Sequence, residues 1–323
     1  MIVLNSISAN KMFAHLDRAT GDRRPITADI FLNNFCNNRC PYCTYRRWEL
    51  DADAYAMTAD EFARYASRLA ELGVQGFILT GGGEPTIAPD FGKICEWLQA
   101  HEIHYGVNTN FNVIQYIQPD YLKVSLDGWD EDSYERARGV RKYHAVRENI
   151  VRYAEWKTKH SPHTSLGIQK VITNPDQIMP FYEANRDLPV DYISLRPVES
   201  TGGKYYASPA ARRAANRAVS LIRDIAKRDS RVVLNFKWSL LDDFPGDACA
   251  AHWAQIAVNE RGQVLYCCHK PYEVVGHVMD SDILEKYGLA HTDMSMCDVP
   301  CRLTAPNLFM KTLSAEYKDA MFL

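Results

Sequence analysis

Residues 26–43 read ITADIFLNNFCNNRCPYC, and this stretch decides the fold. Its first part, Ile26–Asn33, is rich in apolar and β-branched side chains, which predicts a strand. Cys36, Cys40 and Cys43 follow that strand in a CxxxCxxC spacing. Three thiolates in this arrangement can bind three irons of a cubane cluster and leave the fourth iron open. A structural zinc site is the alternative. Such a site normally closes four ligands, and no Cys or His occurs between Cys43 and Cys95.

Short β-type runs alternate with longer amphipathic stretches from Ile26 to Asp229, which is typical of βα units around a parallel sheet. Six such units are too few for a closed eight-stranded barrel of ~250 residues, so we predict an α/β fold with an open, partial (βα)6 barrel. The expected strands are Ile26–Asn33, Gln75–Thr80, Ile103–Thr109, Tyr121–Leu126, Thr164–Ile172 and Asp191–Arg196. The expected helices are Ala59–Leu72, Phe91–Ala100, Tyr143–Lys159, Ile178–Asn185 and Pro209–Lys227.

The pattern changes after the barrel. Two apolar runs, Gln255–Asn259 and Gln263–Cys268, flank a turn with Gly262 and predict a β-hairpin. We expect an N-terminal extension over residues 1–25, the barrel over 26–235, a small cysteine-rich domain over 236–302 and a C-terminal tail over 303–323.

Composition and charge narrow the classes of function. The 323 residues carry a net charge of −3, with no long Lys/Arg run to bind nucleic acid. Neither a signal peptide nor an apolar run of membrane-spanning length is present, so we expect a cytoplasmic protein without a membrane partner. Thiols stay reduced in the cytoplasm, and the nine cysteines therefore indicate metal binding or catalysis before disulfides.

Two motifs together resemble the radical S-adenosylmethionine (SAM) superfamily. Its cysteine motif has an aromatic residue before the last cysteine, here Tyr42, and its glycine segment matches Gly81, Gly82, Gly83 and Glu84 after the second strand. The resemblance implies a [4Fe–4S] cluster on the three cysteines and SAM on its open iron. The glycines would let the backbone approach the methionine amino group of SAM, which residues with a Cβ would prevent.

Further SAM contacts follow from the same resemblance. Tyr42 would lie near the adenine, and Ser125, Asp127 and Arg196 are candidates for the ribose and carboxylate of SAM. Polar residues at strand ends also serve as caps and turns, which is the alternative for these three. The chemistry implied is one-electron cleavage of SAM to a 5′-deoxyadenosyl radical, which takes a hydrogen atom from an unactivated carbon.

Five more cysteines lie in the C-terminal part, and their surroundings resemble the twitch and SPASM extensions of the superfamily. Five thiols permit one auxiliary [4Fe–4S] cluster with four ligands and one spare thiol. The ligands are Cys249, Cys267, Cys297 and Cys301 if the pattern carries over literally, which frees Cys268. We favour Cys267, Cys268, Cys297 and Cys301 as ligands, because Cys249 lies in a loop expected at the active-site face. Cys95 lies in an apolar helix and is expected in the core.

A spare thiol favours epimerisation, in which a cysteine returns a hydrogen atom to the opposite face of a carbon. Dehydrogenation of an alcohol, with an electron passed to the auxiliary cluster, needs no such thiol and is the alternative. A metal-binding protein without turnover is the third reading. Acidic and aromatic residues follow several of the expected strands, and such residues can bind ammonium groups and sugar rings. Exposure of the acidic loops to solvent, without any ligand, is the alternative. The residues are Asp127, Trp129, Asp130, Glu131, Asp132, Tyr205, Tyr206, Trp238, Asp242, Asp243 and Asp247.

The whole pattern resembles the twitch enzymes of aminoglycoside biosynthesis. This resemblance implies inversion of one carbon (C5‴) in the aminosugar of a polycationic aminoglycoside. It also implies an electron donor of the flavodoxin or ferredoxin type.

Overall fold

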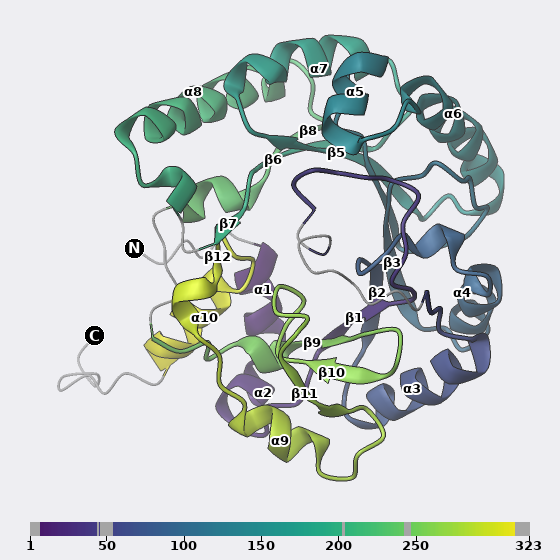
Figure 1. Ribbon diagram of the computed structural model, residues 1–323, viewed down its shortest axis with the longest axis vertical. Coiled ribbons are helices and arrows are strands. Elements are labelled where there is room, and N and C mark those ends of the chain that lie inside the picture. Colours follow the sequence, from purple (N-terminus) through teal and green to yellow (C-terminus); the bar gives the residue numbers. More distant parts are fainter. Residues whose placement is uncertain (1–6, 44, 46–53, 202–203, 242–246, 314–323) are drawn as a thin grey trace.

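The computed structural model describes residues 7–43, 45, 54–201, 204–241 and 247–313. Its main sheet has ten strands in the order β11-β10-β9-β1-β2-β3-β4-β5-β6-β8. Strands from β9 through β1 to β8 pair in parallel, and the sheet curves with helices on its outer side (Figure 1). This is the predicted open α/β partial barrel.

The strands follow the sequence prediction closely within the barrel, and β8 to β11 extend the sheet at its two edges. A separate pair joins β7 to β12. The strands are β1 Thr27–Phe31, β2 Gly76–Thr80, β3 His104–Thr109, β4 Tyr121–Ser125, β5 Ser165–Ile172, β6 Tyr192–Pro197, β7 Ser200–Thr201, β8 Val232–Leu234, β9 Gln255–Val258, β10 Gln263–Leu265, β11 Val274–His277 and β12 Asp298–Val299.

Side-chain caps mark the start of two of the barrel helices. Thr58 and Glu61 form a capping box at α3, and Ser208 caps α8 with Pro209 in its first turn. The helices are α1 Ile7–Ala14, α2 Leu16–Thr20, α3 Ala59–Glu71, α4 Phe91–Ala100, α5 Glu131–Arg138, α6 Tyr143–His160, α7 Ile178–Asn185, α8 Pro209–Ala226, α9 Ile283–Leu289 and α10 Thr304–Leu313. No helix in the described part of the chain is long and apolar enough to cross a membrane.

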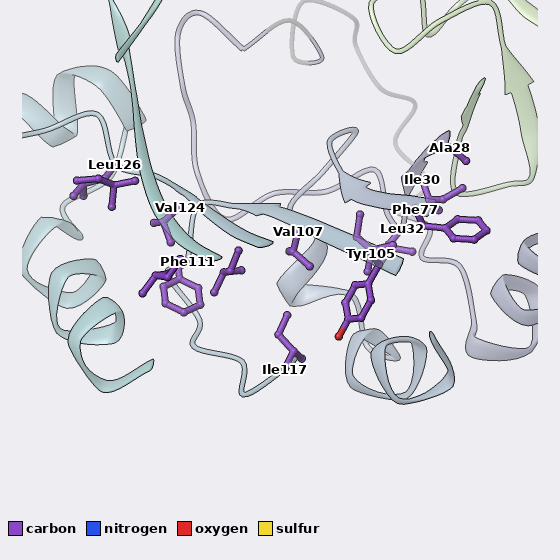
Figure 2. Close-up of a cluster of buried hydrophobic side chains, with 14 of the residues drawn as sticks. Ala28, Ile30, Leu32, Phe77, Tyr105, Val107, Phe111, Ile117, Val124 and Leu126 are labelled. Atoms are coloured by element: carbon purple, nitrogen blue, oxygen red, sulfur yellow. The ribbon is translucent and has the colours of Figure 1, made fainter. Parts of the chain in front are cut away.

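Strand alternation divides the barrel into an apolar outer face and a polar inner face. Ala28, Ile30, Phe77, Val107 and Val124 are buried in the core between the sheet and its helices (Figure 2). Their neighbours along the strands line a cavity inside the barrel: Asp29, Ile78, Thr80, Asn108, Lys123, Ser125, Gln169 and Arg196. The same pattern that builds the core therefore also points polar groups inwards. Cys95 is buried within α4 in the core, as expected.

The C-terminal region continues the barrel sheet. Strand β9 pairs in parallel with β1, and the hairpin predicted around Gly262 is formed by β9 and β10. At the ends of the described chain, α1 packs against α10, where the rings of Phe13 and Phe309 lie 4.9 Å apart. The cysteine-rich part is thus attached directly beside the strand that leads into the first cysteine motif.

Two local expectations are wrong. The acidic segment after β4 is not an open loop, because Asp130 and Ser133 form a capping box that starts α5. The predicted strand Gln263–Cys268 stops at Leu265, so Cys267 and Cys268 lie in the turn beyond β10. Strand alternation therefore does not decide which of these two thiols faces the cavity.

Candidate active site

The site is a cavity of about 890 Å³ inside the barrel, lined in part by residues near the carboxyl ends of the parallel strands and in the loops that follow them. Cys36, Cys40 and Cys43 line it together with Gly81, Gly82, Gly83 and Glu84. The carboxyl ends of parallel strands are the usual place of active sites in α/β proteins. The two motifs found in the sequence therefore meet in one place.

Asparagines hold the cysteine loop against the loop after β3. The Asn110 amide donates to Asn37 Oδ1 (2.6 Å) and lies 3.8 Å from Cys36 Sγ, and Asn112 donates to Asn38 Oδ1 (2.6 Å). The Asn38 backbone N–H also lies 3.3 Å from Cys36 Sγ. Burial raises the pKa of the Cys36 thiol to about 11, so binding iron requires loss of a firmly held proton.

The glycine loop is joined to the same segment by backbone hydrogen bonds. Gly83 N–H donates to Asn33 O (2.8 Å), and Glu84 N–H donates to Phe35 O (2.9 Å). The Asn33 side chain donates in return to Glu84 O (2.8 Å). These bonds place the glycines directly beside the start of the cysteine loop.

Close approach explains why this loop needs glycine. A Cβ on Gly83 would lie 2.0 Å from both Asn33 Oδ1 and Phe35 O, and Gly82 has a φ of +89°. Two cavity-lining polar atoms, Asn108 Oδ1 and Arg196 Nε, are buried without a hydrogen-bond partner in the described part of the chain. A thiol loop, a backbone cradle and unpaired polar atoms fit a cluster with SAM on its open iron.

The predicted SAM-contacting residues fall into two groups. Ser125 and Arg196 line the cavity, and Arg196 pairs with Glu199 at 3.1 Å. The Glu84 carboxylate is buried and accepts bonds from Thr86, Thr109 and Asn110. Its oxygens are thereby used to fasten the glycine loop to β3, even though Glu84 borders the cavity.

Asp127 and Tyr42 lie behind the cavity wall. Asp127 is buried, forms an ion pair with Arg138 and accepts a bond from Val171 N–H (2.7 Å). Burial by itself would raise the pKa of Asp127, but the charges of Arg138 and Lys170 bring it below its usual value. Burial and the nearby Asp127 carboxylate raise the pKa of the Tyr42 hydroxyl well above its usual value.

The five C-terminal cysteines gather near one another. The charges of Cys268, Cys301 and Cys249 all act on Cys267, and those of Cys301 and Cys249 act on Cys297. Cys268 lines the barrel cavity, whereas Cys249 lines a neighbouring pocket of about 200 Å³ with His252 and Tyr266. No three His, Cys, Asp or Glu side chains of the described chain are close enough to hold a single metal ion. A cubane spreads its thiolates over separate irons, which is a wider arrangement.

Tyr45 and Arg302 connect the two groups of cysteines. The Tyr45 hydroxyl donates to Cys268 O (2.9 Å), and its ring meets Phe31 edge to face. Arg302 donates to Cys268 Sγ (2.7 Å) and pairs with Asp29, a fully buried carboxylate on β1. Cys268 therefore lines the same cavity as the three cysteines of the first group.

The charge of the described lining differs from the expectation of acidic loops. Six Lys and Arg side chains line the cavity, against three carboxylates: Arg39, Lys123, Arg138, Arg196, Lys237 and Arg302, with Asp29, Glu84 and Glu199. Asp130 caps α5, Glu131 accepts a bond from His144 N–H, and Asp132 pairs with Arg141. These acids serve the helix and not the cavity.

The aromatic residues expected with those acids have structural partners. Lys170 Nζ lies 5.4 Å from the centre of the Trp129 ring, and the buried Trp238 indole donates to Leu195 O. Tyr205 donates to Thr173 O, and Tyr206 donates to Val198 O. Asp247 lines the pocket that holds Cys249, and Asp242 and Asp243 lie outside the described residues.

Sequence reasoning missed Tyr45, Arg138, Arg302, Asp29 and Lys123. Two of them could have been found from their place in the sequence, because Arg302 directly follows Cys301 and Tyr45 lies two residues after Cys43. Strand alternation could have found Asp29 and Lys123, which are charged residues inside otherwise apolar strands. Nothing in the sequence pattern placed Arg138 beside Cys40.

A parallel partial barrel holds the cysteine loop against the glycine loop. Residues 30–168, which include both loops, match the family model of the Radical SAM superfamily, so this part of the chain is a radical SAM domain.

Relatives and solved structures agree with this at the level of the domain. The probable GTP 3′,8-cyclase of Pyrococcus horikoshii is 33% identical over 125 residues, which cover 36% of this chain and 39% of the cyclase. SuiB of Streptococcus suis, bound to its precursor peptide SuiA, superposes with a TM-score of 0.59 at 15% identity, over 97% of this chain and 72% of SuiB. Native anSMEcpe with bound AdoMet gives 0.59 at 18% identity, over 82% of this chain and 81% of that protein.

The likeness to the solved structures shows the fold. The matched segments span less than half the length of the first curated relatives. Activity, substrate and partners of the whole protein are therefore proposals.

Proposed function

We propose that this chain is a radical SAM epimerase that inverts C5‴ in the aminosugar of an aminoglycoside, a reaction of the neomycin C to neomycin B type. One observation carries the proposal. Five thiols gather in the C-terminal region, one more than an auxiliary [4Fe–4S] cluster needs, and one of them, Cys268, lines the cavity inside the barrel. An epimerase requires such a thiol as its second hydrogen donor.

Cys36, Cys40 and Cys43 would hold the first cluster, with the glycine loop, Ser125 and Arg196 around SAM. When bound, this pair supplies a deoxyadenosyl radical that removes hydrogen from an unactivated carbon. The barrel wall then keeps water away from the substrate and fixes its orientation.

The thiol completes the inversion. Its S–H hydrogen goes to the face of the carbon opposite the one that lost hydrogen, and the sulfur keeps one unpaired electron. One electron from an external donor of the flavodoxin or ferredoxin type and one proton then restore the thiol.

The contacts of Cys268 and Cys249 separate their roles. An iron ligand is a thiolate, whereas a hydrogen-atom donor must keep its proton. The Arg302 guanidinium, held by Asp29, donates to Cys268 Sγ at 2.7 Å and places a positive charge beside this sulfur, as suits an anionic ligand. Cys249 instead meets a neutral donor, the Asn307 amide at 3.4 Å.

We therefore assign Cys249 as the donor and Cys267, Cys268, Cys297 and Cys301 as ligands. The observation that supports the reverse assignment is that Cys268 lines the cavity and Cys249 lies in the adjoining pocket.

The substrate class rests on the resemblance to aminoglycoside enzymes. Asp29 and Glu199 are the cavity carboxylates that could bind ammonium groups of a substrate. Both already form ion pairs within the protein: Asp29 with Arg302, and Glu199 with Arg196 and Lys237. The cavity charges thus add no support for a polycation. A KM that rises with salt would indicate that charge contributes to binding.

Dehydrogenation of an alcohol is the second candidate, and Lys123 is the observation that favours it. Burial and the charges of Arg196 and Arg302 lower the pKa of Lys123 to about 8, and its amine lines the cavity. Such an amine can accept the hydroxyl proton when a carbon radical is oxidised to a ketone.

Turnover in D₂O under anaerobic conditions distinguishes these functions. A thiol exchanges its proton with solvent, so the epimerase should place one deuterium at the inverted carbon and raise the product mass by about one unit. The hydrogen first removed should appear in 5′-deoxyadenosine. A product lighter by about two units would indicate the dehydrogenase instead. An epimer without solvent deuterium would exclude the thiol donor.

A further inference from the structure

We propose that Arg138, held by Asp127, is a positioning residue that donates a hydrogen bond to Cys40 Sγ and raises the reduction potential of the SAM-binding cluster. The inference rests on the radical SAM domain alone and does not depend on the substrate or on epimerisation.

The central observation is a guanidinium on a cysteine sulfur. Arg138 Nη1 lies 3.5 Å from Cys40 Sγ, while its Nη2 pairs with Asp127. The two side chains are 12% and 2% exposed, so solvent screens this contact little. Arg138 thus brings a charged hydrogen-bond donor to a sulfur that would carry iron.

Asp127 is itself held in place from two sides. Its carboxylate accepts Val171 N–H (2.7 Å), and its backbone carbonyl accepts Lys170 Nζ (2.6 Å). Strand β5 thereby fixes the acid, and the acid fixes the fork of Arg138. Asp127 therefore positions Arg138 beside the cysteine loop.

The backbone brings the end of α5 onto the cysteine loop as well. Arg39 N–H donates to Arg138 O (2.8 Å), and a Cβ on Gly139, whose φ is +71°, would lie 2.5 Å from Arg39 O. A helix C-terminus presents partial negative charge, which disfavours a nearby thiolate. The guanidinium offsets this charge where the sulfur lies.

Positive charge and hydrogen bonds at cluster sulfurs stabilise the state that carries the extra electron. Removal of Arg138 should therefore lower the reduction potential. We expect the reduced-to-oxidised ratio at a fixed potential to fall about tenfold in Arg138→Gln, which corresponds to about 59 mV for one electron.

The test is an EPR-monitored redox titration of the reconstituted 323-residue chain with dithionite as reductant. The signal that changes on addition of SAM identifies the cluster with the open iron. Arg136→Gln is the matched control, because it removes the same charge from an exposed position on α5. Arg138→Lys keeps the charge but not the fork, so its potential should lie between those of the wild type and Arg138→Gln.

An unchanged potential in Arg138→Gln with iron retained would overturn the proposal. An equal shift in Arg136→Gln would assign the effect to general charge and overturn it as well. If Arg138→Gln binds no iron, Arg138→Lys provides the measurement. If Arg138→Gln and Arg138→Lys both lose iron while their circular dichroism spectra stay unchanged, Arg138 serves to retain the cluster, and the proposed effect on the reduction potential is rejected.

Discussion

Cys249 and Cys268 compete for the role of the free thiol, and single substitutions distinguish them. If Cys249 is the donor, Cys249→Ala should keep its iron and form deoxyadenosine without epimer, because SAM cleavage does not need this thiol. Cys268→Ala should then lose about half of the iron, since it removes a ligand of the auxiliary cluster. Iron analysis and product chromatography of both variants provide the measurement. Iron loss in Cys249→Ala, with full iron in Cys268→Ala, would exchange the two roles.

The amine of Lys123 should react at an unusually low pH. Burial, then Arg196 and Arg302, lower its pKa to about 8, so the neutral and nucleophilic form exists near that pH. Acylation followed by peptide mass spectrometry should show half-maximal labelling of Lys123 near pH 8.

Exposed Lys93 is the control, because its hydrogen bond to Asp90 raises its pKa. Labelling of both lysines over the same high pH range would show that Lys123 is not perturbed.

At the scale of elements, α5 connects the acidic segment after β4 with the cysteine loop, which lies about 90 residues earlier in the chain. Its N-terminus is a capping box of Asp130 and Ser133, and its last residue touches Cys40. The sequence pattern suggested an acidic loop here, because the eight residues of α5 are mostly charged or polar. In the structure only Ser133 and Tyr134 of this helix are buried. Capping geometry, and not hydrophobic pattern, makes this helix.

Loss of either capping box should cost stability, but only one should alter the cluster. We expect Asp130→Ala and Thr58→Ala each to lower the free energy of unfolding by about 1 kcal/mol. Asp130→Ala should in addition change the EPR signal of the SAM-binding cluster, because α5 positions Arg138. Denaturant titration and EPR of both proteins test this. Identical spectra in the two variants would contradict the link between α5 and the cysteine loop.

At the scale of the whole molecule, one sheet carries both cysteine groups. The first follows β1. Two members of the second, Cys267 and Cys268, lie in the turn after β10, which pairs with β9 beside β1. Parts of the chain more than 200 residues apart thereby share one interior, with Tyr45 bonded to the backbone of Cys268.

Two separate clusters should appear in the iron content. We expect about eight irons per chain after anaerobic reconstitution, four for each [4Fe–4S] cluster. Replacement of Cys36, Cys40 and Cys43 by Ala should remove about half and abolish SAM cleavage. Replacement of Cys297 by Ala should remove the other half and leave the SAM-sensitive EPR signal. About four irons in the wild-type protein would contradict the auxiliary cluster.

The sequence by itself determined the barrel and the first site. Apolar residues that recur with periods of 2 and 3.6 residues predict the strands and the helices. The cysteine and glycine motifs each follow a strand, and they meet because parallel strands end at the same edge of the sheet. Turns and caps determine where β1 and β10 end and that α5 forms. Hydrophobic periodicity carries no information about turns and caps, so the sequence pattern did not predict these features.

Only the tertiary structure decided what surrounds the thiols. Arg138 reaches Cys40 from a helix 98 residues further along the chain, and Arg302 reaches Cys268 while held by Asp29 on β1. These contacts depend on how the elements pack, because an isolated Arg or Asp in a sequence carries no record of its partner. The physical reason is that charges in a buried interior must pair, and the fold alone determines which charges meet.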